Sequence, residues 1–335
     1  MKILFELAKD HITLPKSEVY CCLESEDIEY SVLEENRDVI IIESDCNIED
    51  ITSLEPRFSS VFFIYSYLFD STLDIKSIEK KAENNPISVK GSIAVKYKNR
   101  SDKFNSQDVV KTLAKAYTKN NKVSLNNPDN EIRALITDEK LYVGLKLFEV
   151  NRSVFEERKV QNRPFFSPIS LHPRIARGLV NISCIKKDEL LLDPFCGTGG
   201  ILLEAGLIGI NVAGADIEEK MVSGCKQTLE EYKVKYSDIV CTDIGSIRSY
   251  FDYVDAVVTD LPYGKSTTTK GEDMNKLYDR AFKSIKEVLK TGKRAVIGLP
   301  NTESIELGRK YFTLLEIHEF RAHKSLTRYF AVFEK

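Results

Sequence analysis

Short apolar runs alternate with amphipathic stretches along the second half of the chain. The runs have the length of buried strands, and most of the stretches between them have helical spacing. The predicted strands are residues 190–193, 211–216, 238–241, 254–260, 293–299, 312–320 and 327–334. This order is typical of a doubly wound α/β sheet, here ending in an antiparallel pair.

The first half of the chain has a different pattern, which predicts an α+β region over residues 1–150. Strands are expected in 1–9, 39–43, 60–66 and 92–98, a helix from Ser106, and an antiparallel hairpin from 133–137 and 141–145. Residues 151–171 contain two prolines and no periodicity, which indicates a linker. A helix from His172 to about Ile182 then opens the second domain, residues 172–335.

Charge changes this picture, because it is distributed unevenly. The net charge of the chain is -3, but residues 76–125 contain 12 Lys and Arg against 4 Asp and Glu, whereas residues 1–75 contain 5 against 17. The basic block predicts a surface for a polyanion such as RNA, and its alternative is a solvated lysine-rich face. The candidate RNA-binding residues are Lys90, Lys96, Lys98, Arg100, Lys111 and Lys115.

Other classes of protein are disfavoured by composition. The seven cysteines form no C-x-x-C pair and the four histidines are scattered, so we expect no metal site and reduced thiols. No apolar run approaches the roughly 20 residues that span a bilayer, and Glu6, Lys9 and Asp10 interrupt the apolar start of the chain. We therefore expect a cytoplasmic protein without a membrane partner.

A glycine-rich turn follows the first strand of the second domain, in the run Asp193-Pro194-Phe195-Cys196-Gly197-Thr198-Gly199-Gly200. Glycines let a strand turn sharply into a helix whose free N–H groups face a ligand. The turn is not G-x-G-x-x-G, and Asp193 is placed to accept from an ammonium group, which a dinucleotide lacks. Both details favour S-adenosylmethionine as the cofactor.

The next two strands also end in acids. Asp216 lies at the position that holds ribose hydroxyls, and Asp243 is placed to accept from an adenine amino group. For either acid the alternative is a helix N-cap. The candidate cofactor residues at the three strand ends are Asp193, Phe195, Gly197, Thr198, Gly199, Asp216, Ile217, Asp243 and Ile244.

The fourth strand runs into Asp260-Leu261-Pro262-Tyr263-Gly264, which predicts a catalytic loop for methylating an amine on an aromatic ring. Such a nitrogen is a poor nucleophile, so a site must accept its protons and stabilise its developing charge. The Asp260 carboxylate and the Leu261 carbonyl supply acceptors, Pro262 sets the backbone direction, and Tyr263 stacks on the base. The alternative is a tight turn after a core strand. The catalytic interpretation requires both turns to open onto one pocket.

Three segments resemble one known family. D-P-F-C-G-T-G-G-I-L-L-E-A, T-D-L-P-Y-G-K-S-T-T and R-P-F-F-S-P-I-S-L-H-P-R-I-A-R-G-L-V-N are similar to the archaeal tRNA (guanine(10)-N2)-methyltransferases. The resemblance is strong over roughly residues 130–300. Over the first 75 residues the chain resembles the family only in pattern. It implies a ferredoxin-like part and a THUMP RNA-binding domain before a Rossmann-fold methyltransferase domain.

The resemblance also implies roles for individual residues. Asp193, Gly197, Gly199, Asp216 and Asp243 would line the cofactor pocket, and Phe166, Ser167 and Pro168 would close over its methionine end. The usual catalytic motif is D-P-P-Y, and Leu261 replaces its first proline here. Asp260 favours this family over relatives with N-[LP]-P-Y, which methylate guanosine 6 of tRNA or adenine.

The expected function is methylation of the 2-amino group of guanosine 10 in tRNA, with one or two methyl groups added. Two alternatives stay open: a methyltransferase for another tRNA or rRNA guanosine, such as guanosine 6, or for DNA adenine, and a non-catalytic RNA-binding protein. The expected partner is tRNA. A small activating subunit is left open, and a monomer is favoured.

Overall fold

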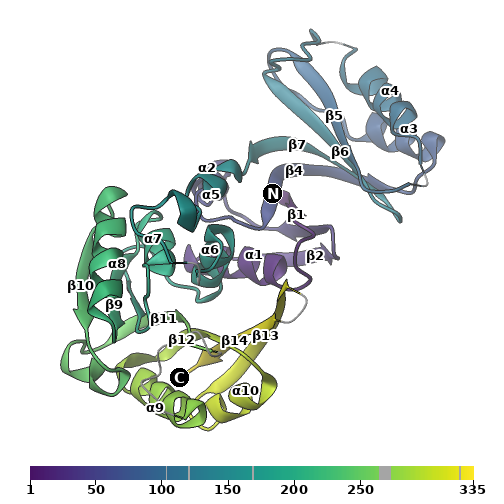
Figure 1. The fold of residues 1–335 in the computed structure, drawn as a ribbon. Helices are drawn as coiled ribbons and strands as arrows, with labels where there is room; N and C mark the ends of the chain where they lie inside the picture. Colours follow the sequence, from purple (N-terminus) through teal and green to yellow (C-terminus); the bar gives the residue numbers. More distant parts are fainter. Residues whose placement is uncertain (103, 120, 168–169, 264–272, 324–325) are drawn as a thin grey trace. The chain divides into compact units, whose positions relative to one another are not determined.

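The computed structural model describes residues 1–102, 104–119, 121–167, 170–263, 273–323 and 326–335, and they form two compact units (Figure 1). Unit 1 contains residues 1–10, 28–55 and 61–150, and unit 2 contains residues 11–27, 56–60 and 151–335. The first unit ends at Val150, close to the predicted boundary, but two segments of the expected N-terminal region belong to unit 2. In the part of the chain that the structure describes, no helix is long and apolar enough to span a bilayer.

Unit 1 is built on a seven-stranded sheet in the order β2-β3-β1-β4-β7-β6-β5. The strands are β1 (Lys2–Leu7), β2 (Ser31–Glu35), β3 (Val39–Glu43), β4 (Val61–Ser71), β5 (Ile93–Asn99), β6 (Asn130–Ile136) and β7 (Leu141–Glu149). The expected hairpin is β6 and β7, paired antiparallel. β5 pairs with β6 in parallel, and one helix lies in the connection between these two strands.

Three helices accompany this sheet: α2 (Ile48–Ser53), α3 (Ile75–Asn84) and α4 (Ser106–Tyr117). The side chains of Asp74 and Asn105 accept backbone N–H groups at the starts of α3 and α4. Val109, Leu113 and Tyr117 follow at intervals of four and bury one face of α4 against the core. Figure 1 shows α3 and α4 side by side along β5 and β6.

Unit 2 is the predicted doubly wound sheet, in the order β10-β9-β8-β11-β12-β14-β13. Its strands are β8 (Leu190–Asp193), β9 (Asn211–Asp216), β10 (Tyr236–Cys241), β11 (Val254–Asp260), β12 (Leu289–Leu299), β13 (Thr313–His323) and β14 (Leu326–Glu334). Neighbours from β10 to β12 run parallel, and β14 pairs antiparallel with both β12 and β13. The predicted fold class is therefore confirmed.

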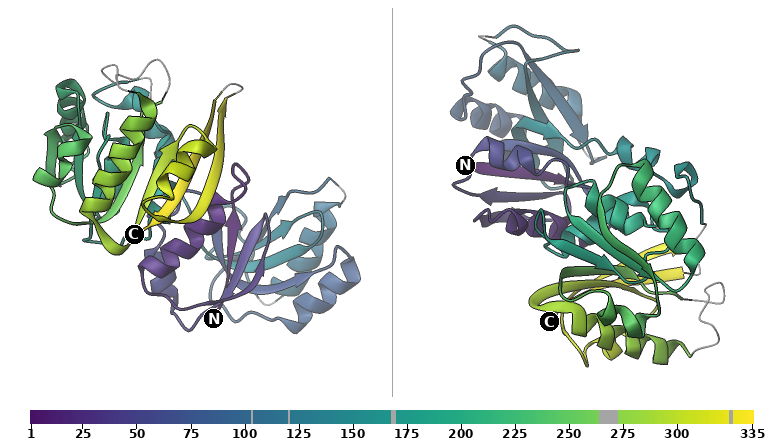
Figure 2. Two further views of the ribbon diagram at one scale, coloured as in Figure 1. Left: turned by 90° about the horizontal axis from the view of Figure 1, so that it is seen from below. Right: turned by 90° about the vertical axis from the view of Figure 1, so that its left-hand side faces the viewer.

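Helices cover both faces of this sheet, and each face has its own apolar core. The helices are α1 (Leu14–Ser25), α5 (Ser153–Glu157), α6 (Pro173–Ile182), α7 (Gly200–Gly206), α8 (Glu219–Glu231), α9 (Met274–Val288) and α10 (Thr302–Gly308), with 3-10 turns η1 (Val160–Asn162) and η2 (Ile244–Ser249). The right-hand view of Figure 2 shows the sheet between the green α7 and α8 and the yellow-green α9 and α10. The expected linker 151–171 contains α5 and η1, and it belongs to unit 2.

Candidate active site

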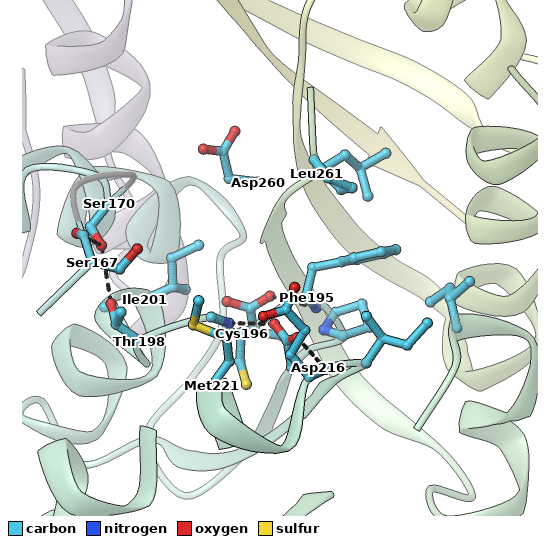
Figure 3. Close-up of a pocket in the computed structure, with 18 of the residues that line it drawn as sticks. Ser167, Ser170, Phe195, Cys196, Thr198, Ile201, Asp216, Met221, Asp260 and Leu261 are labelled. Atoms are coloured by element: carbon cyan, nitrogen blue, oxygen red, sulfur yellow. Dashed lines mark hydrogen bonds between the residues drawn. The ribbon is translucent and has the colours of Figure 1, made fainter. Parts of the chain in front are cut away.

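A cavity of about 510 Å³ opens at the carboxyl ends of β8, β9 and β11 in unit 2. This is the size of pocket that holds a cofactor, and it lies where parallel α/β sheets bind ligands. The glycine-rich turn after β8 and the Asp260 turn after β11 both line it. In Figure 3, Asp260 and Leu261 are drawn across the cavity from Asp216 and Met221. The two turns therefore meet at one cavity, as the catalytic interpretation requires.

The glycine turn takes a backbone path that other residues rarely adopt. Gly197 and Gly199 have φ angles of 49° and 79°, in the left-handed region. Gly199 is the N-cap of α7, and a Cβ added there would lie 2.7 Å from Cys225 Sγ. Gly199 shapes the turn but is not among the residues that line the cavity, whereas Gly197 and Thr198 line it.

Asp193 lies at the floor of the cavity and is 1% exposed. Its Oδ1 accepts the Phe195 backbone N–H at 3.1 Å and the Thr259 hydroxyl at 2.7 Å, which leaves Oδ2 for a ligand. The pKa of Asp193 is raised to about 7, mainly by burial; the hydrogen bonds oppose this rise, and the nearby charges of Asp216 and Asp260 contribute to it. A ligand ammonium group at this position would supply the missing positive charge.

Asp216 and Asp243 also line the cavity, but each is held by the protein itself. Asp216 accepts the backbone N–H groups of Gly197 at 3.0 Å and Glu218 at 2.9 Å, which joins the first two strand-end turns. Asp243 caps η2 and forms a bidentate ion pair with Arg280, whose Nη1 and Nη2 donate to Oδ1 at 2.5 Å and to Oδ2 at 3.1 Å. The N-cap alternative is thus present at Asp243, and the partner Arg280 was not predicted.

The predicted catalytic loop is anchored by three contacts. The backbone N–H of Leu261 donates to the Gly298 carbonyl at 3.1 Å, and the Leu261 side chain is fully buried in the core. The Tyr278 hydroxyl, from α9, donates to the Pro262 carbonyl at 2.8 Å. Apolar packing of Leu261 therefore holds the loop at the position where a proline was expected.

Asp260 is the acid of this loop, and its side chain is 18% exposed. Its Oδ2 lies 3.2 Å from Nη1 of Arg328, and its Oδ1 has no hydrogen-bond partner among the described residues. Burial raises the pKa of Asp260 to about 6, while Arg328 lowers it. The carboxylate is ionised at neutral pH and keeps lone pairs for a donor that enters the cavity.

Models of two protein families match the chain. The model of the RMKL-like methyltransferase domain matches residues 161–329, and the THUMP domain model matches residues 74–146. The tRNA (guanine(10)-N2)-dimethyltransferase of Methanothermobacter thermautotrophicus is 32% identical over 340 residues, which cover 100% of both chains. The chain belongs to this methyltransferase family. The enzyme of the same description from Pyrococcus abyssi is 36% identical over 273 residues, which cover 79% of this chain and 80% of that one.

Solved structures share the fold of this family member over its whole length. TrmN from Thermus thermophilus has a TM-score of 0.58 at 19% identity and covers 100% of both chains. SMU.472, a methyltransferase crystallised with SAH, has a TM-score of 0.54 at 14% identity and covers 99% of this chain and 97% of its own. At these identities the likeness concerns the fold.

Most of the predicted cofactor residues of the methyltransferase domain line the cavity, as does the whole predicted catalytic set. Phe166 and Gly199 are not among the lining residues, Phe166 being 55% exposed, and Pro168 lies outside the described residues. Ser167 lines the cavity beside Ser170, whose hydroxyl is 3.1 Å from the Thr198 hydroxyl (Figure 3). The lining residues that sequence reasoning missed are Ser170, Leu171, Pro194, Cys196, Gly200, Ile201, Glu218, Met221, Thr242 and Leu277.

Most of these missed residues could have been predicted from the sequence, because they are neighbours of predicted residues in the same turns. Met221, on the first turn of α8, follows from the position of Asp216 five residues earlier. Leu277 comes from α9, and Arg280 and Arg328 from α9 and β14, so their places depend on how distant elements pack. Their sequence surroundings carry no recognisable signal.

The candidate RNA-binding residues of the THUMP-containing unit differ in their surroundings. Lys90, Lys98 and Lys111 are exposed. Lys115 pairs with Glu79 at 2.7 Å, and Lys96 pairs with Glu131 at 2.8 Å.

Arg100 does not fit the predicted RNA surface. Its side chain is 7% exposed and pairs with the buried Glu6 at 2.9 Å and the partly buried Asp38 at 2.8 Å, so it compensates acids of unit 1 instead of facing solvent.

One group of potential metal ligands lies elsewhere in unit 2. Cys21, Glu24 and Cys184 each offer an atom within 4.8 Å of the others. Arg294 Nη1 donates to the sulfur of Cys21 at 3.1 Å and to that of Cys184 at 2.7 Å. A guanidinium cation thus already lies against both sulfurs, and we assign no metal to this methyltransferase.

Proposed function

We propose that the protein transfers methyl groups from S-adenosylmethionine to the exocyclic 2-amino group of guanosine 10 in tRNA. The observation that carries the proposal is the partly buried Asp260 carboxylate, whose Oδ1 has no hydrogen-bond partner among the described residues, on the same cavity as Asp193 and the glycine-rich turn. The names of the two archaeal relatives supply the nucleotide and its atom.

The cavity fits S-adenosylmethionine by the chemistry of its lining. Asp193 offers a buried carboxylate oxygen for the ammonium group, and the turn at the start of α7 offers backbone N–H groups to the carboxylate. Asp216 and Asp243 stand at the next strand ends for the ribose and the adenine, and Ser167 adds a polar group from the segment before α6. When bound, the cofactor supplies an activated methyl group on a sulfonium.

The protein's own contribution to the reaction is alignment and charge. Asp260 and the Leu261 carbonyl accept the two N–H groups of the amine, which turns its lone pair toward the methyl carbon. The Asp260 carboxylate would stabilise the positive charge that the amine nitrogen gains on methylation. Asp260 then passes the released proton to solvent, and the Tyr263 ring holds the base by stacking.

Guanosine 10 lies in a base-paired stem, so it must leave its stack to enter the cavity. Unstacking and unpairing of one base requires a few kcal/mol, which contacts of the protein with the rest of the tRNA must offset. The exposed lysines of unit 1 are the proposed source of those contacts. A second methyl transfer to the same nitrogen gives the dimethylated product for which the relatives are named.

The test of this function compares wild type with Asp260→Ala and Asp260→Asn on a tRNA transcript. We expect N2-methylated guanosine at position 10, and a rate loss of roughly 100-fold or more in both variants, because the charged acceptor is gone. Calorimetry should show S-adenosylmethionine bound within about threefold of wild type, since Asp193 is intact.

A transcript with adenosine at position 10 is the substrate control, and nucleoside mass spectrometry reads the product. Full activity of Asp260→Ala would refute the assigned role. Methylation at guanosine 6, or of an adenine, would show a different target for the same chemistry.

The proposed partner and location follow from this substrate. The protein would act on tRNA in the cytoplasm as a monomer, and light scattering after size-exclusion chromatography should give the mass of one chain, 38.1 kDa. A requirement for an activating subunit would show as tRNA methylation that appears only when cell extract is added.

A further inference from the structure

Arg328 is a cation in an unusual place. It lies on β14, an interior strand of the methyltransferase sheet between β12 and β13, and its side chain is 11% exposed. Neighbours on the same strand include Phe330 and Val332, both in the core. Burial of a guanidinium in such surroundings is unfavourable unless specific partners compensate for its lost hydration.

The compensating contacts of Arg328 are with the catalytic loop. Its Nη1 lies 3.2 Å from Asp260 Oδ2, and its Cζ lies 4.7 Å from the centre of the Tyr263 ring. Arg328 itself is not among the residues that line the cavity, whereas both of its contacts line it. One planar group behind the site therefore touches the proposed proton acceptor and the proposed stacking ring together.

Gly298 is the second residue that contacts the Asp260 carboxylate. It pairs with Asp260 across β11 and β12, and a Cβ added there would lie 2.3 Å from Asp260 Oδ1. The absent side chain makes room for Oδ1, while Arg328 holds Oδ2. These two contacts select one orientation of the carboxylate and leave its other lone pairs unused.

We propose that Arg328 is a positioning residue for methyl transfer, which fixes Asp260 and Tyr263 in the arrangement that receives the target base. The inference rests on the proposed function, because it needs an amine held by Asp260 and a ring stacked by Tyr263. Arginine suits this role better than lysine, since its planar group can bond a carboxylate and stack on a ring at once.

The charged and titratable groups around Asp260 allow the role to be measured. Asp193 faces it from β8, Tyr278 from α9, Tyr263 from the loop itself and Arg328 from β14. Of these, Arg328 is the cation that favours the ionised form of Asp260, against the effect of burial. Removing it should raise the pH at which Asp260 loses its proton.

The experiment measures single-turnover methyl transfer by the full chain from pH 5 to 9 for wild type, Arg328→Met and Arg328→Lys. The control is Arg321→Met, an exposed arginine on the adjacent strand β13. For Arg328→Met we expect the rate of methyl transfer to fall about 100-fold. We also expect the acid limb of its pH–rate profile, where the rate falls as Asp260 takes up a proton, to lie about one pH unit higher than in wild type. Arg328→Lys keeps a charge but not a planar group. The acid limb of its pH–rate profile should therefore stay at the wild-type pH, while its rate falls about tenfold.

Calorimetry of S-adenosylmethionine binding shows whether each variant is folded. If Arg328→Met does not bind the cofactor, Arg328→Lys decides: a slower rate with normal cofactor affinity supports the inference. A wild-type rate in Arg328→Lys, or an unmoved acid limb in a folded Arg328→Met, overturns it.

The test of Arg328 can be distinguished from the test of the proposed function, because the wild-type product is mapped separately. Product mapping in wild type tests the target nucleotide, whereas the ratios between variants and wild type test Arg328 on whichever amine is methylated.

Discussion

Four aspartates line the cavity, and their surroundings give them different chemistry. Backbone N–H groups hold Asp216, and Arg280 with a backbone N–H holds Asp243, so both are tied into the turns that carry them. Burial raises the pKa of Asp193 to about 7 and that of Asp260 to about 6. Raised values in a cleft are typical of groups that await a charged or donating ligand.

The raised pKa of Asp193 predicts that cofactor affinity depends on pH. Only the ionised carboxylate attracts an ammonium group, and in the empty protein Asp193 takes up its proton as pH falls through about 7. We expect the Kd of S-adenosylmethionine to rise towards tenfold per pH unit below that value, measured by calorimetry between pH 8 and 5. Asp193→Asn should bind weakly with a flatter profile, and an equally steep profile would contradict this assignment.

At the scale of elements, α1 shows why a segment of the first 30 residues belongs to the methyltransferase unit. Glu18 on α1 is fully buried, and it accepts from the backbone of Ser59 at 3.0 Å and of Ser60 at 2.7 Å. It also accepts from the amide of Asn181 on α6, at 2.8 Å. One carboxylate thus joins all three chain segments of unit 2.

Removal of this carboxylate should destabilise the protein. Glu18→Ala leaves several buried donors unsatisfied, at roughly 3 kcal/mol, which corresponds to a fall in Tm of about 6–12 °C for a domain of this size. Thermal unfolding followed by circular dichroism measures the shift. Glu231→Ala, at an exposed position at the end of α8, is the control and should stay within about 2 °C. Equal Tm values for the two variants would argue against the buried network.

At the scale of the whole molecule, acidic and basic residues are separated along the sequence. The structure shows which basic side chains form ion pairs and which are exposed. Glu131 on β6 pairs with Lys96, Arg133 and Lys146, so these three cations share one carboxylate within unit 1. Lys98 and Lys111 are exposed and remain candidates for contact with phosphate groups.

Charge reversal at these two lysines should weaken tRNA binding. For Lys98→Glu with Lys111→Glu we expect an affinity loss of about tenfold or more and a shallower dependence on salt, by roughly one unit of slope per lost phosphate contact. Filter binding at several salt concentrations measures both. Lys310→Glu, at an exposed position of unit 2, changes the net charge in the same direction. If it weakens binding equally, the effect is one of general charge.

The sequence by itself determined the strands of the methyltransferase domain, the two turns predicted to hold the cofactor and the catalytic residues, and the acids of these turns. Apolar periodicity, glycines at a strand end and the Asp260-Leu261-Pro262-Tyr263 run are local features, and parallel strand order alone brings their ends to one edge. Segment-level agreement was close: β8, β9 and β11 have the predicted bounds, and β12 begins four residues before its prediction.

Only the tertiary structure decided which charges meet. Arg100 was expected at an RNA surface but compensates acids of unit 1, and Arg328 had no expected role but lies against Asp260 and Tyr263. The assignment of α1 to the second unit likewise depends on Ser59, Ser60 and Asn181, which are far from Glu18 in the chain. A charged side chain carries no periodicity that reveals its partner, because the partner is chosen by the packing of distant elements.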